Sequence, residues 1–166
     1  MKIGILKETL DGERRVAITP NIAKQLIASG FELLAEEGAG EYSSFKDSDY
    51  KNVGVAVEKR AVIFHEAEVL LKINPFDEED LKLVDKGQIL ISKLYHKSNP
   101  DLIKAIANKG VSAFSMDAIP RISRAQDMDV LSSQNNLAGY KAVILGAFEM
   151  TKIFPLMMTS AGTIAP

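Results

Sequence analysis

Short apolar runs alternate with amphipathic stretches along the first 115 residues of the chain. Each run holds four to six residues, rich in aliphatic side chains and bounded by turn formers, which is typical of buried strands. We therefore expect strands at residues 2–7, 31–36, 55–58, 69–73, 89–94 and 111–114.

The stretches between these runs predict helices. The first has Thr19 at the N-cap position, Pro20 at the first helical position and Gly30 as its stop, a pattern that marks both helix ends. Further helices are expected at residues 47–53, 77–84 and 100–109, with a helix or loop at 61–66. Strands that alternate with helices indicate βαβ units and a mainly parallel sheet with helices on both faces. The predicted class is doubly wound α/β, flavodoxin- or Rossmann-like, and we favour the flavodoxin-like topology.

The last third of the chain has a different pattern. One long helix is predicted from Asp127 onward, and residues 142–158 are largely apolar. Glu149, Lys152 and Pro155 interrupt this stretch, which falls short of the roughly 20 clean apolar residues that a membrane span needs. We expect a buried helix followed by a strand or loop, an exit segment at residues 156–166, and no membrane span. The expected division is an α/β domain at residues 1–125 and a long helix with a connector at residues 126–166.

The composition is that of one soluble globular domain. The 166 residues are 46% apolar and 25% charged, with a net charge of −2. Lys and Arg are scattered, so no basic face for nucleic acid is expected. There is no cysteine and there are two histidines, His65 and His96, which excludes disulfides and Cys-based zinc sites and leaves no metal site expected. No signal-peptide pattern is visible at the N-terminus, and a cytoplasmic location is expected.

A glycine-rich segment follows the second predicted strand and resembles a dinucleotide fingerprint. Gly38 and Gly40 have the spacing of its first two glycines, and Glu58 stands where a ribose-binding acid belongs. Ser43 replaces the third glycine, however, and no apolar helix opens behind it. We therefore interpret the segment as a turn after a strand rather than a phosphate loop.

Three charged side chains near strand ends are candidates for ligand binding. Arg15 follows the first strand, at the sheet edge where open α/β folds bind ligands, and can clamp a carboxylate, although a solvated or ion-paired loop is the preferred interpretation. Lys72 ends an apolar strand and is as well explained by a ligand role as by a side chain that reaches outward to water. His96 has no evident partner in the sequence and is interpreted as a surface residue.

The most unusual segment is the polar stretch at residues 120–133, PRISRAQDMDVLSS. It gathers guanidinium, amide, carboxylate and hydroxyl groups in a loop that leads into the predicted long helix. These groups suit a planar carboxamide, which has one carbonyl and one NH₂. The residues alone indicate a polar loop that caps a helix, with Asp127 or Asp129 as the cap.

The chain resembles the N-terminal domain that alanine dehydrogenases share with NAD(P) transhydrogenase alpha subunits. Motifs common to both are Lys7-Glu8, Glu13-Arg14-Arg15-Val16-Ala17-Ile18-Thr19-Pro20, Gly38-Ala39-Gly40 and Leu71-Lys72. Motifs of the transhydrogenase form are Pro120-Arg121, Gln126, Met128-Asp129, Leu131-Ser132-Ser133-Gln134, Ala138-Gly139-Tyr140-Lys141-Ala142 and Thr159-Ser160-Ala161-Gly162. Alanine dehydrogenases lack this polar loop and carry a catalytic histidine near the position of Tyr95.

The resemblance implies direct hydride transfer from NADH to NADP⁺, coupled to proton movement through membrane subunits. Arg121, Asp129 and Ser132 match family positions that hold the nicotinamide of NAD(H), and Asp127 and Met128 complete the set of candidate cofactor-binding residues. Gln126 matches the position that reaches toward NADP(H) on the partner component, so it is the candidate catalytic residue. The cofactors chemically perform the reaction, and the protein orients them.

The resemblance also implies partners. Family members continue past the position of Pro166 into an NAD-binding Rossmann domain, which this sequence does not contain. Membrane and NADP-binding subunits and a homodimer are implied, with a cytoplasmic location, peripheral on the bacterial inner membrane. The isolated chain is expected to be inactive. Two alternatives stay open: an alanine-dehydrogenase-like domain in which Arg15 and Lys72 bind a keto-acid carboxylate, and a non-catalytic binding or assembly module.

Overall fold

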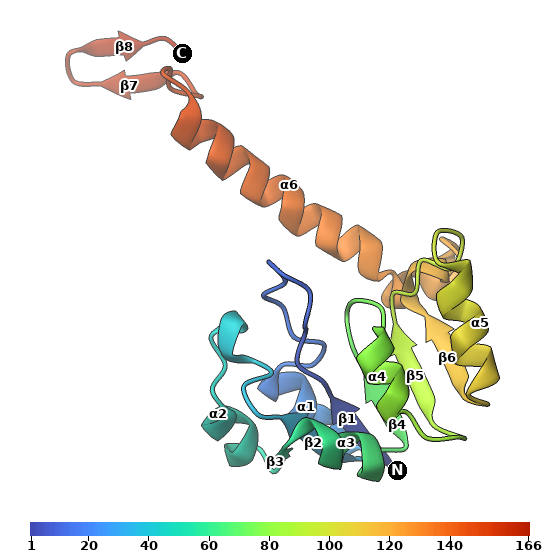
Figure 1. Cartoon of the computed structure of the whole chain (residues 1–166). Helices are drawn as coiled ribbons and strands as arrows, with labels where there is room; N and C mark the ends of the chain where they lie inside the picture. Colours follow the sequence, from blue (N-terminus) through green and yellow to red (C-terminus); the bar gives the residue numbers. More distant parts are fainter. The chain divides into compact units, whose positions relative to one another are not determined.

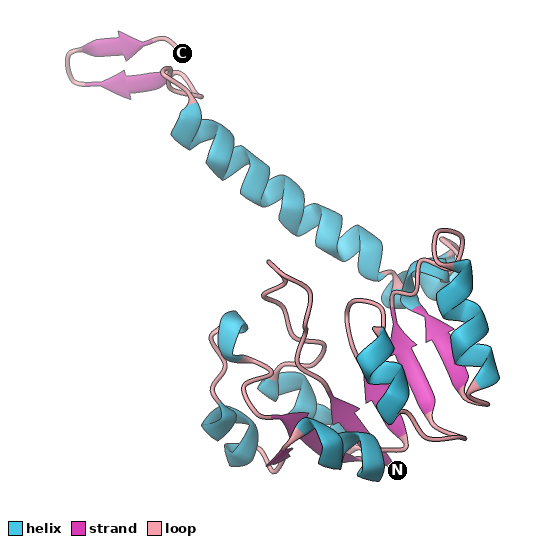
Figure 2. Cartoon of the chain, viewed as in Figure 1, coloured by secondary structure: helices cyan, strands magenta, loops and turns pink.

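A computed structural model describes residues 1–166 and divides them into two compact units, Met1–Pro120 and Arg121–Pro166 (Figure 1). The first unit contains a six-stranded sheet with its helices, and the second contains a long helix with a hairpin (Figure 2). Each unit is described by itself.

The first unit alternates strands with helices, as the apolar pattern predicts. Its elements in chain order are β1 Lys2–Ile5, α1 Pro20–Ala28, β2 Glu32–Glu36, η1 Glu41–Ser43, α2 Asp47–Asn52, β3 Ala56–Glu58, α3 Arg60–Glu66, β4 Val69–Leu71, α4 Glu78–Leu83, β5 Ile89–Ser92, α5 Pro100–Asn108, β6 Ser112–Ser115 and η2 Met116–Ala118. All six expected strands are present, each shorter than or equal in length to its apolar run.

The six strands are all parallel and lie in the order β3-β2-β1-β4-β5-β6. This order is that of a Rossmann fold, with the reversal of direction between β1 and β4. The doubly wound α/β class is confirmed, whereas the preference for the flavodoxin-like order 2-1-3-4-5 is wrong. The chain places β3 beside β2 at the outer edge, and the spacing of apolar runs carries no information about which side of β1 a crossover takes.

The sheet is buried on both faces, which explains the nearly continuous apolar runs. Successive residues of β2 point to opposite sides: Leu33 and Ala35 belong to one core cluster, and Leu34 belongs to the other. Val69 and Leu70 of β4 separate in the same way. Two hydrophobic cores therefore form, one on each side of the sheet.

The second unit begins with a six-residue 3₁₀ helix, η3 Ser123–Met128, followed by α6 Val130–Glu149. No residue of α6 is buried, so the expectation of a buried helix is wrong for this chain. None of the helices is long and apolar enough to be a membrane span. The helix also starts three residues later than expected, because Asp129 caps it.

Residues 156–166, which were expected to form an exit segment, have regular structure. They contain a two-stranded antiparallel hairpin of β7 Met157–Thr159 and β8 Gly162–Ile164, which was not predicted from the sequence. The hydroxyl of Thr159 donates to the carbonyl of Gly162 at 3.0 Å and accepts from the N–H of Ala161 at 3.2 Å, which closes the turn. Gly162 has φ 125°, a conformation that side chains disfavour.

A buried ionic chain joins four elements of the first unit. Nζ of Lys72, just after β4, lies 2.6 Å from Oδ2 of Asp80 in α4, and the second carboxylate oxygen of Asp80 pairs with Arg60 of α3. Arg60 also donates to Glu36 at the end of β2 at 2.6 Å. The side chains of Lys72 and Asp80 are 1% and 0% exposed. A single carboxylate thus pairs with two cations, the fully buried Lys72 and Arg60, whose side chain is 24% exposed.

We predict that Asp80→Asn destabilises the first unit by about 3–5 kcal/mol, because the neutral amide leaves the buried Lys72 and the half-buried Arg60 without their shared carboxylate. The matched control is Asp101→Asn, which makes the same chemical change in the exposed i,i+3 pair with Lys104 and is expected to have little effect. Urea unfolding followed by circular dichroism measures both. Equal losses of unfolding free energy in the two variants would show that the buried ionic chain contributes no more than an exposed ion pair.

Candidate functional site

The polar segment identified in the sequence forms the start of the second unit. Gln126, Asp127 and Met128 lie in η3, and Ser132 lies in the first turn of α6. The side chains of Arg121, Gln126 and Asp127 are exposed, and Met128 is 51% exposed. All six candidate residues therefore belong to one continuous stretch whose polar groups are accessible.

Asp129 is the N-cap of α6. Its Oδ1 accepts hydrogen bonds from the backbone N–H groups of Leu131 at 3.1 Å and Ser132 at 2.9 Å, while Oδ2 accepts from the hydroxyl of Ser132 at 2.6 Å. A helix start has N–H groups without intrahelical partners, and an aspartate at this position satisfies them. Of the two proposed caps, Asp129 is confirmed and Asp127 is wrong.

These contacts hold the Asp129 carboxylate in its charged form. The hydrogen bond from the Ser132 hydroxyl is the largest of several causes that lower the pKa of Asp129 below its ordinary value, and the nearby Arg121 adds to it. Nε of Arg121 lies 3.9 Å from Oδ2 of Asp129, within ion-pair range but beyond hydrogen-bond range. Arg121 is thus drawn toward the cap without being fixed by it.

Gln126, in contrast, is not fixed through its side chain. Its backbone carbonyl accepts from the N–H of Asp129 at 3.2 Å, whereas its side-chain amide takes part in no hydrogen bond. Asp127 and Met128 likewise make no side-chain hydrogen bond or ion pair. The loop therefore presents one immobilised pair, Asp129 with Ser132, beside side chains that are available to a ligand.

The donors and acceptors that remain open match a carboxamide. Oδ1 of Asp129 already accepts twice, but Oδ2 accepts only from Ser132 and retains capacity for one more donor. The Ser132 hydroxyl uses its single proton on Asp129 and can only accept further hydrogen bonds. The guanidinium N–H groups of Arg121 can donate to a carbonyl oxygen. An NH₂ group beside Asp129 and Ser132, and a carbonyl beside Arg121, would satisfy all of them.

Two of the three candidates near strand ends in the first unit, Lys72 and Arg15, are engaged within the chain. Lys72 is buried against Asp80 and does not reach outward, so neither of its two interpretations from sequence describes it fully. Arg15 pairs with Glu13, with NH2 to Oε2 at 2.6 Å, as the preferred interpretation of an ion-paired loop holds. His96 is exposed, as expected of a surface residue, and lies in no ion pair or hydrogen bond.

The glycine-rich segment forms a tight turn. It leads into η1, which has only three residues, so no helix N-terminus is available for a phosphate. A Cβ at Gly40 would lie 2.8 Å from side-chain atoms of Phe45 and Tyr50. Close packing against Phe45 and the ring of Tyr50 thus accounts for Gly40, and this geometry is that of a turn after a strand.

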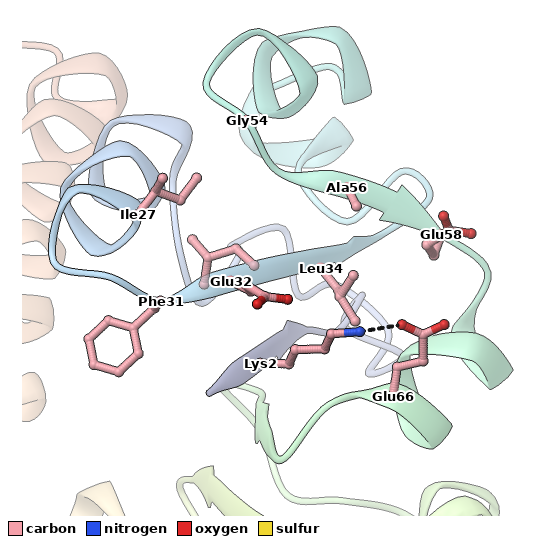
Figure 3. A pocket seen from close by; sticks show the side chains of 10 residues that line it. Lys2, Ile27, Phe31, Glu32, Leu34, Gly54, Ala56, Glu58 and Glu66 are labelled. Atoms are coloured by element: carbon pink, nitrogen blue, oxygen red, sulfur yellow. Dashed lines mark hydrogen bonds and ion pairs between the residues drawn. The ribbon is translucent and has the colours of Figure 1, made fainter.

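A shallow depression of about 390 Å³ lies near the amino ends of β1 to β3 (Figure 3). Lys2 and Glu66 form an ion pair of 2.9 Å at its rim, which Figure 3 marks with a dashed line. Doubly wound folds bind ligands at the opposite edge of the sheet, beyond the carboxyl ends of the strands. The depression is therefore not a candidate for the functional site.

Tyr95 has a backbone conformation that the sequence does not signal. Its φ is 49°, in the left-handed region that a bulky residue seldom adopts. The N–H groups of Leu94 and Tyr95 both donate to Oδ1 of Asp117, at 2.9 and 3.3 Å. The carbonyl of Tyr95 accepts from Ser98 and Asn99 at 2.8 and 3.0 Å. Four hydrogen bonds to the backbone groups of Leu94 and Tyr95 thus fix the loop after β5.

Comparison with known proteins assigns the family. Residues 4–138 match the family model described as alanine dehydrogenase/PNT, N-terminal domain. The chain belongs to this family. The resemblance drawn from the sequence is confirmed.

Among curated relatives, the transhydrogenase subunits are more similar than the alanine dehydrogenases. The first part of NAD(P) transhydrogenase subunit alpha from Rhodospirillum rubrum is 42% identical over 100% of this chain and 45% of its own length. The NAD(P) transhydrogenase subunit alpha of Haemophilus influenzae is 37% identical over 100% of this chain and 32% of its own. The alanine dehydrogenase of Bacillus subtilis is 31% identical over 89% of this chain and 38% of its own. The chain thus spans less than half the length of these relatives.

A solved structure agrees. The crystal structure of a transhydrogenase from Sinorhizobium meliloti matches with a TM-score of 0.91 and 39% identity, over 99% of this chain and 49% of that one. An L-alanine dehydrogenase structure matches with a TM-score of 0.69 and 25% identity, over 72% of this chain and 33% of that one. The chain is therefore similar to the N-terminal part of transhydrogenase alpha subunits.

We predict that Asp129→Ala frays the first turn of α6 at neutral pH, because the N–H groups of Leu131 and Ser132 lose their acceptor. The folded pKa of Asp129 lies below its ordinary value, so the cap stabilises the helix above that ordinary value and is lost as the pH falls through the folded pKa. Amide chemical shifts of Leu131 and Ser132, followed by NMR between about pH 7 and pH 2, are expected to titrate in the wild type and stay flat in the variant. Asp127→Ala is the control and is expected to leave both shifts unchanged.

Proposed function

We propose that this chain is the N-terminal part of the NAD(H)-binding component of a proton-translocating NAD(P) transhydrogenase, where it orients the nicotinamide for hydride transfer from NADH to NADP⁺. The observation that carries the proposal is the polar loop at residues 121–132, in which an immobilised carboxylate–hydroxyl pair stands beside an uncommitted amide and guanidinium. The names of the transhydrogenase relatives support the same reaction class.

The nucleotides supply the hydride chemistry, and the residues of the loop bind and orient. Asp129 and Ser132 accept from the carboxamide NH₂, and Arg121 donates to its carbonyl. Because the N-cap already fixes Asp129 and Ser132, little side-chain entropy is lost when the ring binds. Asp127 and Met128 line the same loop, and Met128 offers an adaptable apolar contact for the face of a ring.

Gln126 is the residue that we propose to contact both cofactors. Its exposed amide can donate and accept at the same time, so it can contact the NAD(H) of its own component and the NADP(H) of the partner component together. Hydride transfer between two rings needs no acid, base or nucleophile, and it depends strongly on their separation and alignment. Gln126 is therefore proposed as the catalytic residue through its position between the rings, and no metal takes part.

The proposal requires partners, since the relatives are more than twice as long as this chain. An NAD-binding Rossmann domain holds the adenine and pyrophosphate. Membrane and NADP-binding subunits couple the reaction to proton movement, and two copies of the component associate. The chain then lies at the cytoplasmic face of a bacterial inner membrane, attached through these subunits.

The alanine-dehydrogenase-like alternative is less well supported. Arg15 is paired with Glu13 and Lys72 with Asp80, so neither cation is prepared for a keto-acid carboxylate, and Tyr95 stands where those enzymes carry a histidine. A non-catalytic assembly module is distinguished by nucleotide dependence: its complexes would form equally well with and without NADH.

We predict that the isolated chain binds NADH with a dissociation constant weaker than about 1 mM, because the pyrophosphate-binding turn and helix N-terminus of a dinucleotide site are absent from its described elements. Isothermal titration calorimetry checks this. A micromolar dissociation constant would overturn the proposal that a Rossmann domain, and not this chain, holds the pyrophosphate.

We further predict that Gln126→Asn in the assembled complex slows the hydride step by roughly 10–100-fold while the affinity for NADH stays nearly constant. The shorter side chain withdraws its amide from the ring-to-ring contact but leaves the Asp129 cap intact. Single-turnover kinetics measures the step, and a separate NADH titration measures affinity. Gln25→Asn makes the same change on the exposed surface of α1 and is expected to alter neither. An unchanged hydride rate in Gln126→Asn would reject the bridging role.

A further inference from the structure

The side chains of Asp129 and Ser132 have a fixed hydrogen-bond polarity. The hydroxyl of Ser132 donates its only proton to Oδ2 of Asp129 at 2.6 Å, while Oδ1 accepts from the backbone N–H groups of Leu131 and Ser132 at 3.1 and 2.9 Å. The hydroxyl of Ser133, next in the chain, lies within hydrogen-bond distance of the carbonyls of Asp129 and Val130, at 3.4 and 3.2 Å. Only lone pairs therefore remain open on Asp129 and Ser132, so this pair offers a ligand acceptors and no donor.

The start of α6 keeps this polarity in place. If Ser132 turned its proton toward a ligand, Oδ2 of Asp129 would lose the donor that it has within the chain. If the carboxylate turned away, the first N–H groups of the helix would lose their acceptor. Asp129 is also held in its charged form, because the hydrogen bond from the Ser132 hydroxyl is the largest cause that lowers its pKa. At neutral pH the pair is thus an anionic acceptor that the helix start holds in one arrangement.

Arg121 lies beside this pair but does not decide between an amide and a carboxylate. Its Nε is 3.9 Å from Oδ2 of Asp129, and its side chain is 64% exposed. An exposed cation contributes little to the binding of a single charge, because water and salt screen it. The N–H groups of Arg121 can donate both to the carbonyl oxygen of an amide and to an oxygen of a carboxylate. Selection between the two groups therefore depends on Asp129 and Ser132.

From this geometry we infer that Asp129 and Ser132 make the chain specific for nicotinamide dinucleotides over deamido dinucleotides, in which a ring carboxylate replaces the carboxamide. The inference rests on the proposed function and concerns which ligand the same loop rejects. The two ligands differ by NH₂ against O⁻ and have nearly the same shape, so packing does not separate them. The amide donates to the open lone pairs, whereas the carboxylate has no proton to donate and brings a negative charge against Asp129. A site that hydrogen-bonds an N–H group of its ligand rejects an analogue without that group.

Asp129→Asn is expected to invert this selection without removing the cap. Asparagine and aspartate are N-caps of similar quality, and the amide oxygen can keep the N–H groups of Leu131 and Ser132. The amide NH₂ then takes the place of Oδ2 and donates to the Ser132 hydroxyl, whose proton turns toward the ligand. The variant pair thus presents a donor where the wild type presents acceptors. A residue with a structural role alone would lower the affinity for both ligands together and would not invert the preference.

The test compares NADH with reduced deamido-NAD in the assembled complex. Calorimetric titration measures the two dissociation constants, and single-turnover kinetics measures hydride transfer to NADP⁺ from each ligand. The wild type is expected to bind NADH roughly 100-fold more tightly, below the ratios of about 10⁴–10⁵ that such sites can reach, because Ser132 and Arg121 are exposed to water. In Asp129→Asn the ratio is expected to fall to about 1 or below. Ser132→Ala removes one acceptor, is expected to lower the ratio by roughly 3–10-fold, and serves as the second variant if Asp129→Asn does not assemble.

The matched control is Asp101→Asn, which makes the same chemical change in the first turn of α5 and is expected to leave the ratio unchanged. Equal binding of both ligands by the wild type, an equal loss of both in Asp129→Asn, or a ratio that Asp129→Asn leaves unchanged would overturn the inference. In those cases hydride transfer from NADH by the wild type would still support the proposed function. Absence of that transfer in the wild-type complex would instead overturn the proposed function, and the inference with it.

Discussion

The carboxylate of Asp80 is the constraint on which the first unit depends. It has no exposed surface, and it pairs with both Lys72 and Arg60. Because removing one partner of a buried ion pair strands the remaining charge, α3, α4 and the end of β4 must hold their positions together. Arg60 extends the chain to Glu36, so the carboxyl end of β2 is fixed as well. A pair of hydrophobic cores stabilises the sheet, but this ionic chain sets the arrangement of the elements at the carboxyl edge of the sheet.

That arrangement has a consequence for ligand binding. The edge of a doubly wound sheet that ordinarily receives a nucleotide holds two internal systems here, one around Asp80 and one around Glu13 and Glu8. Each cation of these systems already has a carboxylate partner from the same chain. The first unit therefore has the fold of a dinucleotide-binding domain while its own charges fill the crevice, which agrees with the proposal that another domain holds the phosphates of the cofactor.

The strands were predictable from the sequence because both faces of the sheet are buried, and aliphatic residues therefore occupy consecutive positions. The order of the strands was not, since parallel crossovers of similar length can pass to either side of β1. Lys72 shows that the sequence does not reveal long-range ion pairs either. Its apolar neighbours indicate a strand, but its partner Asp80 lies eight residues away in the acidic run 77–80, which is equally typical of an exposed helix start. The 129–132 cap was predictable from local chemistry, with Asp127 as the one competing choice. The 157–164 hairpin was missed because its turn depends on Gly162 and Thr159, a pattern without a strong apolar alternation.

The candidate site combines rigidity and availability in adjacent residues. Asp129 must accept the N–H groups of α6 whether or not a ligand is present, so the helix itself keeps this carboxylate and Ser132 in position. Gln126 lies one turn earlier in η3, and only its backbone is committed. Fixed groups are suited to holding a ring in one orientation, whereas an uncommitted amide is suited to a contact that forms only when a second component arrives. Under the proposed function, the boundary between the 3₁₀ helix and α6 therefore separates residues that bind one cofactor from the residue that meets the other.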